Sequence, residues 1–281
     1  MKRFRGLASF WFSLSLSLSL SFSLSFSLPC FAQRDTVQSP KITTTVNMIG
    51  VGHTNVLDNY ISQEKYRGTE LRFVSMTDKI NPQKRISFQR LFQVNVSLPH
   101  NRAKTGNHLV GMLNYSLGWH CNWYLLSNRL RLQAGGLADV NFGGIYNTRG
   151  GNNCGQLRAY INISPSVAAT YDFKLWQHNF SVRYSADIPL CGLMFSPNYG
   201  QSYYEIFTEH KSDHNIVFTY TGNTPSLRQM LTLDFPISTA TFRIGYLGDF
   251  QQSHVNGIKT HIWTNSVMFG IVKRFKLSKI R

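Results

Sequence analysis

The run between residues 258 and 275 constrains the fold more than any other part of the sequence. From Trp263 to Phe275 every second residue is mostly large and apolar, and the residues between them are mostly small or polar. A two-residue period is that of a β-strand, and this run is longer than a typical strand of a soluble protein. Taken alone, the pattern fits either a strand of a membrane barrel or a strand of a soluble β-sandwich.

A strand near the chain end that closes on an aromatic residue resembles the C-terminal sorting strand of bacterial outer-membrane β-barrels. In this resemblance Phe275 is the terminal aromatic residue, and a basic tail follows it from 276 to 281. The resemblance implies insertion of the chain into an outer membrane.

The N-terminal segment predicts export. Lys2, Arg3 and Arg5 precede an uncharged run of apolar and serine residues, and small residues lie near Ala32 where a signal peptidase would cleave. We therefore expect a signal peptide over residues 1–32 and a single barrel domain over 33–281. The alternative is an uncleaved membrane anchor.

Charge and cysteine content limit the partners. Three of the 29 basic residues lie in the predicted signal, which leaves 26 basic against 13 acidic residues. An exported chain meets little nucleic acid. We therefore expect the net positive charge to attract anionic lipopolysaccharide or an anionic small solute. Cys121, Cys154 and Cys191 remain, an odd number without metal-binding spacing, which permits one disulfide but no disulfide framework.

Alternation recurs along the mature chain. About twelve strands are predicted, with ten or fourteen as alternatives, and no stretch approaches the apolar length of a transmembrane helix. The candidate strands are 42–50, 69–77, 86–98, 107–124, 129–142, 159–173, 180–188, 202–208, 215–220, 227–235, 239–251 and 258–275.

The connections alternate in length. Short turns are expected at 78–85, 125–128, 174–179, 209–214 and 236–238, and longer loops at 51–68, 146–157 and 192–201. Outer-membrane barrels combine short periplasmic turns with long external loops, whereas a soluble sandwich has no reason to do so. With large aromatic residues near the strand ends, this favours an all-β, antiparallel transmembrane β-barrel.

The polar faces of the strands carry charges that a soluble core rarely tolerates but a barrel lumen accepts. We expect Asp234 near Arg243, and Asp172 near Arg183. Such pairs either brace the wall or line a selective pore. The predicted lumen-lining residues are Arg129, Arg131, Asp139, Asp172, Arg183, Asp187, Arg228, Asp234, Arg243 and Asp249.

Other candidate sites are sparse. Tyr199, Tyr203 and Tyr204 form a possible contact surface for a glycan or a partner, or else an internally packed loop. No nucleotide, metalloprotease or nucleophile motif occurs. His210 and His214 fall in a predicted turn and are not expected to bind metal. His120, Ser116 and Asn114 share one strand face without an orienting group, so no catalytic residue is predicted.

Five stretches resemble Bacteroidetes-type exported proteins grouped as domain of unknown function 3316. The matching stretches are 52–60 (GHTNVLDNY), 143–153 (GGIYNTRGGNN), 195–207 (FSPNYGQSYYEIF), 225–235 (PSLRQMLTLDF) and 243–256 (RIGYLGDFQQSHVN). The resemblance implies an exported, barrel-like protein and brings no activity or ligand with it.

The sequence thus predicts an integral outer-membrane barrel that is either structural or a narrow, anion-preferring channel for small solutes. It is not expected to be an enzyme or to need a cofactor. The expected partners are outer-membrane lipid, lipopolysaccharide and the barrel-assembly machinery. A lipid-modifying barrel enzyme and a soluble periplasmic β-protein are the alternatives.

Overall fold

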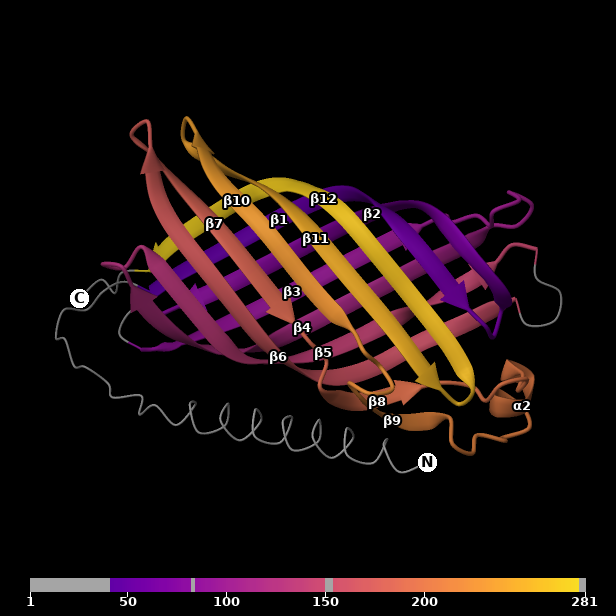
Figure 1. Ribbon diagram of the computed structural model, residues 1–281. Helices are drawn as coiled ribbons and strands as arrows, with labels where there is room; N and C mark the ends of the chain where they lie inside the picture. The colour runs from indigo at the N-terminus through magenta and orange to yellow at the C-terminus, as the bar shows by residue number, and fades with distance from the viewer. Residues whose placement is uncertain (1–40, 82–83, 150–153, 278–281) are drawn as a thin grey trace, which may run out of the picture. The chain divides into compact units, whose positions relative to one another are not determined.

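The computed structural model describes residues 41–81, 84–149 and 154–277 (Figure 1). The predicted signal peptide lies outside these residues. No helix in this part of the chain is both long enough and apolar enough to cross a membrane. The elements are β1 (Lys41–Asp58), β2 (Ser62–Ile80), β3 (Ile86–Ser97), β4 (His108–Leu125), β5 (Leu130–Asn147), β6 (Gly155–Leu175), β7 (His178–Asp187), β8 (Cys191–Phe195), α2 (Tyr203–Phe207), β9 (Ile216–Tyr220), β10 (Leu227–Ile237), β11 (Ala240–Val255) and β12 (Ile258–Leu277).

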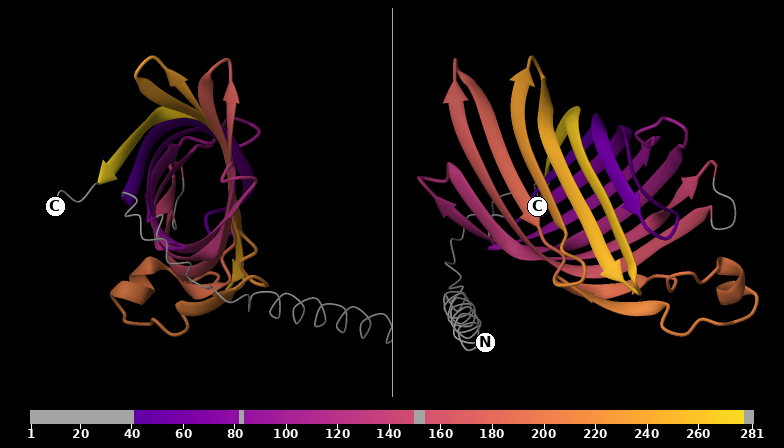
Figure 2. Two further views of the ribbon diagram at one scale, coloured as in Figure 1. Left: turned by 90° about the vertical axis from the view of Figure 1, so that its left-hand side faces the viewer. Right: turned by 45° about the vertical axis from the view of Figure 1, so that its right-hand side comes forward.

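Ten of the twelve strands form a closed antiparallel ring. The pairing runs in the order β5, β4, β3, β2, β1, β12, β11, β10, β7, β6, and β6 pairs again with β5. Seen end-on, the ring is an oval (Figure 2, left). β8 pairs with β6, and β9 pairs with β8 alone, so these two short strands lie outside the ring. The predicted all-β antiparallel barrel is confirmed, with ten strands in its wall.

The alternation of the sequence separates an apolar outer face from a largely polar inner face. On β5, Val140 is 44% exposed, whereas Asp139 and Asn141 on either side of it are 3% exposed. On β11 the same contrast separates exposed Ile244 from buried Arg243. Each wall strand therefore presents one set of side chains outward and the other inward.

The two ends of the ring differ. The end that we call the turn end carries the β2–β3, β4–β5, β6–β7 and β10–β11 turns, and the tips of the last two splay apart (Figures 1 and 2). The β6–β7 turn consists of Trp176 and Gln177, whose φ angles of 47° and 66° are typical of tight hairpins that match strand twist. The opposite end, the loop end, carries β8, α2 and β9.

Four expectations about local structure were wrong. Residues 51–68 form the paired ends of β1 and β2, joined by a short turn, and not a loop. The segment predicted as a strand at 202–208 contains α2, because Ser202 and Glu205 form a reciprocal capping box. The turn predicted at 209–214 lies at the loop end, between α2 and β9, and the loop predicted at 192–201 contains most of β8.

The interior holds apolar clusters as well as charges. The larger cluster gathers buried residues of six strands: Val46, Met48, Val74, Met76, Leu91, Met230, Leu247, Met268 and Val272. A second, nearer the loop end, includes Val56, Val110 and Ile262. Side chains of six consecutive wall strands thus pack against one another inside the ring, and the interior is a packed core over these levels.

Candidate functional site

Ion pairs cross the interior between strands that are not neighbours. Arg72 Nε on β2 lies 2.7 Å from Glu70 Oε1, and its Nη1 lies 3.2 Å from Asp249 Oδ2 on β11. Arg183 Nη1 on β7 lies 2.8 Å from Asp78 Oδ2 on β2. All of these side chains are buried. Arg72–Glu70 lies within β2, whereas Arg72–Asp249 and Arg183–Asp78 tie strands together that are not neighbours in the ring.

The predicted hairpin pair of Asp234 and Arg243 is present. Arg243 donates to both carboxylate oxygens of Asp234, with distances of 2.5 and 2.8 Å, and Arg274 Nη2 adds a contact of 3.3 Å to Asp234. Asp234 and Arg243 are direct register partners across the β10–β11 hairpin, which explains why the sequence could anticipate them.

Most of the predicted lumen residues face inward. The structure buries Asp139, Arg183, Asp187, Asp234, Arg243 and Asp249. Arg131 and Arg228 are inward and partly buried. Arg129 and Asp172 do not line the interior: Arg129 lies exposed in the β4–β5 turn, and Asp172 is exposed where β6 leaves the ring. The expected contact of Asp172 with Arg183 is therefore replaced by that of Asp78 with Arg183.

Several inward charges were missed in the sequence. Glu70, Arg72, Asp78 and Arg158 are all buried on inner faces. Glu70 and Arg72 alternate with outward Leu71 and would have been found by extending the two-residue period through β2. Asp78 falls in the turn predicted at 78–85, because the apolar alternation stops before β2 ends at Ile80.

The ring wall is interrupted beside β7. β7 and β10 pair only from Ser181–Asp234 to Asp187–Arg228, the shortest run of pairing in the ring. Toward the loop end, β8 takes the place of β7 along β6, and the chain before β10 bonds instead to β11 through Ser226 and Gln252. β9 and β10 have no registered pairing, so the wall is split here.

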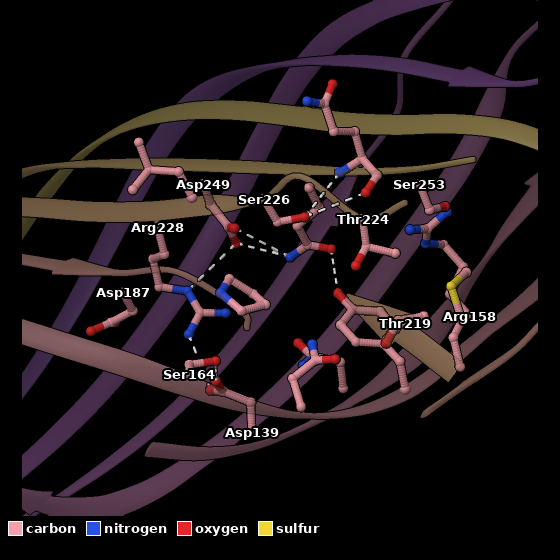
Figure 3. Close-up of a pocket in the computed structure, with 18 residues that line it drawn as sticks. Asp139, Arg158, Ser164, Asp187, Thr219, Thr224, Ser226, Arg228, Asp249 and Ser253 are labelled. Atoms are coloured by element: carbon pink, nitrogen blue, oxygen red, sulfur yellow. Dashed lines mark hydrogen bonds and ion pairs between the residues drawn. The ribbon is translucent and has the colours of Figure 1, made fainter. Parts of the chain in front are cut away.

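A polar pocket lies inside this split (Figure 3). It has a volume of about 40 Å³, and the empty space is about 560 Å³ when the open solvent is included. Its walls combine inner residues of β5, β6 and β11 with residues from the ends of β7 and β10 and from β8 and β9. The charged residues among them are Asp139, Arg158, Asp187, Arg228 and Asp249.

The charges of this pocket differ in how well they are satisfied. Asp139 accepts short hydrogen bonds from the hydroxyls of Ser116 and Ser164, and Asp249 accepts from Arg72 and Gln251. Arg228, in contrast, lies 3.6 Å from Asp139 and 4.0 Å from Asp249, the longest of the interior ion pairs. The pocket therefore has a rigid acidic wall and a loosely held arginine.

Four polar atoms of the pocket lack a hydrogen-bond partner in the described part of the chain. They are Asp187 Oδ1, Thr219 Oγ1, Arg158 Nε and Arg228 Nε. Asp187, Thr219 and Arg158 are more than nine-tenths buried. Buried polar groups are normally paired, so this group of unpaired atoms marks a place where a polar partner fits.

A serine and a histidine also meet inside the ring. His120 Nε2 lies 2.9 Å from Ser166 Oγ, across Gly135, which lies between them in the register and has no side chain to separate them. His120 Nδ1 has no partner among the described residues. Without a group that orients the imidazole, the pair lacks the arrangement of a hydrolytic triad.

The predicted loop contacts divide in two. Tyr199 and Tyr204 are exposed. Tyr203 packs against Phe195 and Phe207, and its hydroxyl accepts from the Leu157 backbone N–H at 2.7 Å. Burial raises the pKa of Tyr203 to about 12, so its hydroxyl stays protonated and fixes α2 against β6.

The remaining candidates do not line the pocket. Phe275 lies outward and exposed near the end of β12, opposite Thr43 of β1. Cys121, Cys154 and Cys191 are all free. In the ranges that the structure describes, no group of three or more metal-ligating side chains comes together, and this includes His210 and His214.

Solved structures with a similar course of the chain include an outer membrane protease and two autotransporter domains. The outer membrane protease OmpT from Escherichia coli is 7% identical, with a TM-score of 0.45 over 87% of this chain and 100% of that chain. The transport unit of the Escherichia coli autotransporter AIDA-I is 10% identical, with a TM-score of 0.44 over 94% and 98%. The translocator domain of the autotransporter NalP from Neisseria meningitidis is 10% identical, with a TM-score of 0.42 over 94% and 98%.

No curated protein matches the sequence. A family model described as "Protein of unknown function (DUF3316)" matches residues 15–281, nearly the whole sequence. The chain therefore belongs to the DUF3316 family.

Proposed function

We propose that the protein is an integral outer-membrane β-barrel whose lumen is closed by its own side chains. The observation that carries this proposal is the contrast between the two faces of the ring. The outer face exposes large apolar residues such as Trp119, Ile163 and Val267, and the inner face pairs its charges across the interior. An apolar exterior with a polar interior is the arrangement of a barrel in lipid.

Closure of the ring supports the same placement. A bilayer offers no water to hydrogen-bond a free strand edge, so only closed barrels and helices span it. The pairing of β5 with β6 joins the two ends of the ten-stranded sheet, and pairing continues round the ring except in the split beside β7 and β10. Outer-membrane lipid and lipopolysaccharide then surround the wall, and the barrel-assembly machinery inserts it.

The interior favours a wall over a pore. Side chains can fill an eight-stranded barrel, and a ten-stranded ring is only moderately wider. Here the interior contains apolar clusters and crossing ion pairs such as Arg72–Asp249. No infolded loop is needed to fill it, since residues 51–68 belong to the wall itself.

The test has two parts. Outer membranes washed with carbonate should retain the protein, and its migration in gels should change on heating. The purified protein in a planar bilayer should produce no conductance steps. Loss of the protein in the wash would contradict the membrane placement, and stable conductance would contradict the closed lumen.

A narrow, anion-preferring channel is the second candidate, favoured by Arg131. This inward arginine has no carboxylate partner among the described residues, and its Nε is buried and unpaired. Uncompensated positive charge in a narrow passage concentrates anions. If conductance is found, the reversal potential under a salt gradient should indicate anion preference, and Arg131→Ser should reduce it.

That the protein is not an enzyme stays a prediction. It is supported by the unpaired Nδ1 of His120, which leaves the His120–Ser166 contact without an orienting acid.

A further inference from the structure

We propose that the pocket beside the β7–β10 seam binds the hydroxyl groups of a neutral sugar or other polyol. The β7–β10 seam is the paired stretch between Ser181–Asp234 and Asp187–Arg228. The inference deepens the proposed function and rests on it for the surroundings of the pocket.

The unpaired atoms define the chemistry of the ligand. Asp187 Oδ1 can only accept from a neutral ligand, Arg158 Nε and Arg228 Nε can only donate, and Thr219 Oγ1 can do either. One group that both donates and accepts, without charge, is a hydroxyl. A polyol carries several hydroxyls on one carbon frame, so it can pair with more than one of these atoms, whereas Asp187 and Arg158 lie on opposite sides of the pocket (Figure 3).

Charged ligands fit less well. An anion would face the carboxylates of Asp139, Asp187 and Asp249 in one small space. A cation would face Arg158 and Arg228. A neutral ligand avoids both repulsions, and buried polar groups give the greatest discrimination when each is paired.

The volume sets the extent of contact. A cavity of about 40 Å³ holds on the order of three water molecules. This corresponds to two or three hydroxyls at one edge of a sugar ring, with the rest of the molecule in the open mouth. Thr224 and Ser226 line the pocket where the chain approaches β10, and they offer further hydroxyls.

Two sources can present such hydroxyls. A free sugar could enter from the loop end. A sugar that belongs to a membrane lipid could enter through the split, where Leu193 of β8 and Phe218 of β9 expose apolar side chains outside the ring. The chemistry of recognition is the same in both cases.

The test uses the full mature chain, refolded in a zwitterionic detergent that contains no sugar. Heat-dependent gel migration first establishes that the barrel is folded. Calorimetric titrations then use free hexoses and mannitol in one arm and purified lipopolysaccharide in the other. Binding in the first arm identifies a free sugar, and binding in the second arm alone identifies a lipid-borne sugar.

Variants locate the binding. Thr219→Val, which keeps the shape and removes an unpaired hydroxyl, should lower affinity about tenfold. Asp187→Asn should lower it at least as much. The matched control is Thr54→Val, because Thr54 Oγ1 is also buried and unpaired but lies outside the pocket. An equal loss of affinity in Thr54→Val would overturn the assignment of binding to this pocket.

The failures are distinguishable. A folded, heat-modifiable barrel that binds neither class of probe overturns the pocket inference and leaves the barrel proposal standing. The pocket inference is also overturned if a probe binds and neither Thr219→Val nor Asp187→Asn weakens that binding. Loss from carbonate-washed membranes overturns the membrane placement, whatever the purified protein binds.

Discussion

The seam between β1 and β12 and the seam between β7 and β10 close the same ring in different ways. β1 and β12 stay in register from Lys41–Leu277 to Asp58–Thr260, the whole length of β1. β7 and β10 pair only from Ser181–Asp234 to Asp187–Arg228, where β7 ends, and their tips separate toward the turn end. The polar pocket lies beside the short seam, where backbone pairing stops. The long seam, where pairing is continuous, only closes the ring.

The largest expected effect comes from breaking the long seam. A Cβ at Gly50 would lie 2.5 Å from the Val267 carbonyl oxygen and would overlap Met268 Sδ, so Gly50→Val forces β1 from β12. Overpacking of this kind costs about 3 kcal/mol, and backbone displacement adds to it. We expect loss of the heat-modifiable form. Gly111→Val is the control, because a Cβ there meets nothing within 4 Å; equal damage by both would contradict this account of the seam.

The next effect concerns the interior tie between β7 and β2. Asp78→Leu leaves the buried Arg183 guanidinium without its carboxylate and should cost about 3–5 kcal/mol. The double variant Asp78→Leu with Arg183→Met should recover most of that free energy of unfolding, since no unpaired charge remains. Denaturant titrations of the refolded protein measure both. If the double variant is no more stable than Asp78→Leu alone, the loss of stability does not come from the unpaired charge of Arg183.

A smaller effect separates the wall from the strands outside it. Under the proposed membrane placement, Ile244→Arg puts a charge on the lipid-facing wall and should cost up to about 2–4 kcal/mol. Phe218→Arg on β9, although its side chain is also exposed, should cost less than about 1 kcal/mol if β9 stands clear of the hydrocarbon. Yields of membrane-inserted protein compare the two. The reverse order would place β9 in the bilayer.

The smallest effect needs no substitution. Backbone amides of β7 should exchange with solvent deuterium faster than those of β1, because a short seam opens locally at lower free energy. Peptide-resolved hydrogen exchange on the folded protein measures this difference. Equal protection of the two strands would mean that the split does not weaken the seam.

Much of the fold follows from local pattern. The alternation of Val140 with Asp139 and Asn141 fixes both the strand and its facing, because a two-residue period has only one register that hides the polar side chains. The pattern fails where few apolar residues mark the inner face, even though some of them, such as Val56 and Tyr66, are buried in an apolar cluster. Residues 51–68 show no apolar alternation, yet they continue β1 and β2 because backbone pairing with neighbouring strands extends beyond the apolar surface.

The candidate site could be predicted only in part. Asp234 and Arg243 are partners across one hairpin, so sequence distance and turn length suffice to pair them. Arg72 and Asp249 belong to strands that neither follow one another nor pair, and only the closed ring brings them together. The pocket depends on a further fact without a local signal: β8 replaces β7 beside β6.

Pairing of β1 with β12 also sets a time order for assembly. The partner of the first wall strand is the last one made, and at roughly 5–20 residues per second the ribosome needs roughly ten to forty seconds to synthesise the chain between them. Throughout that interval the edge of β1 that faces away from β2 lacks its native partner. Closure of the ring at this seam can therefore begin only once β12 has been synthesised.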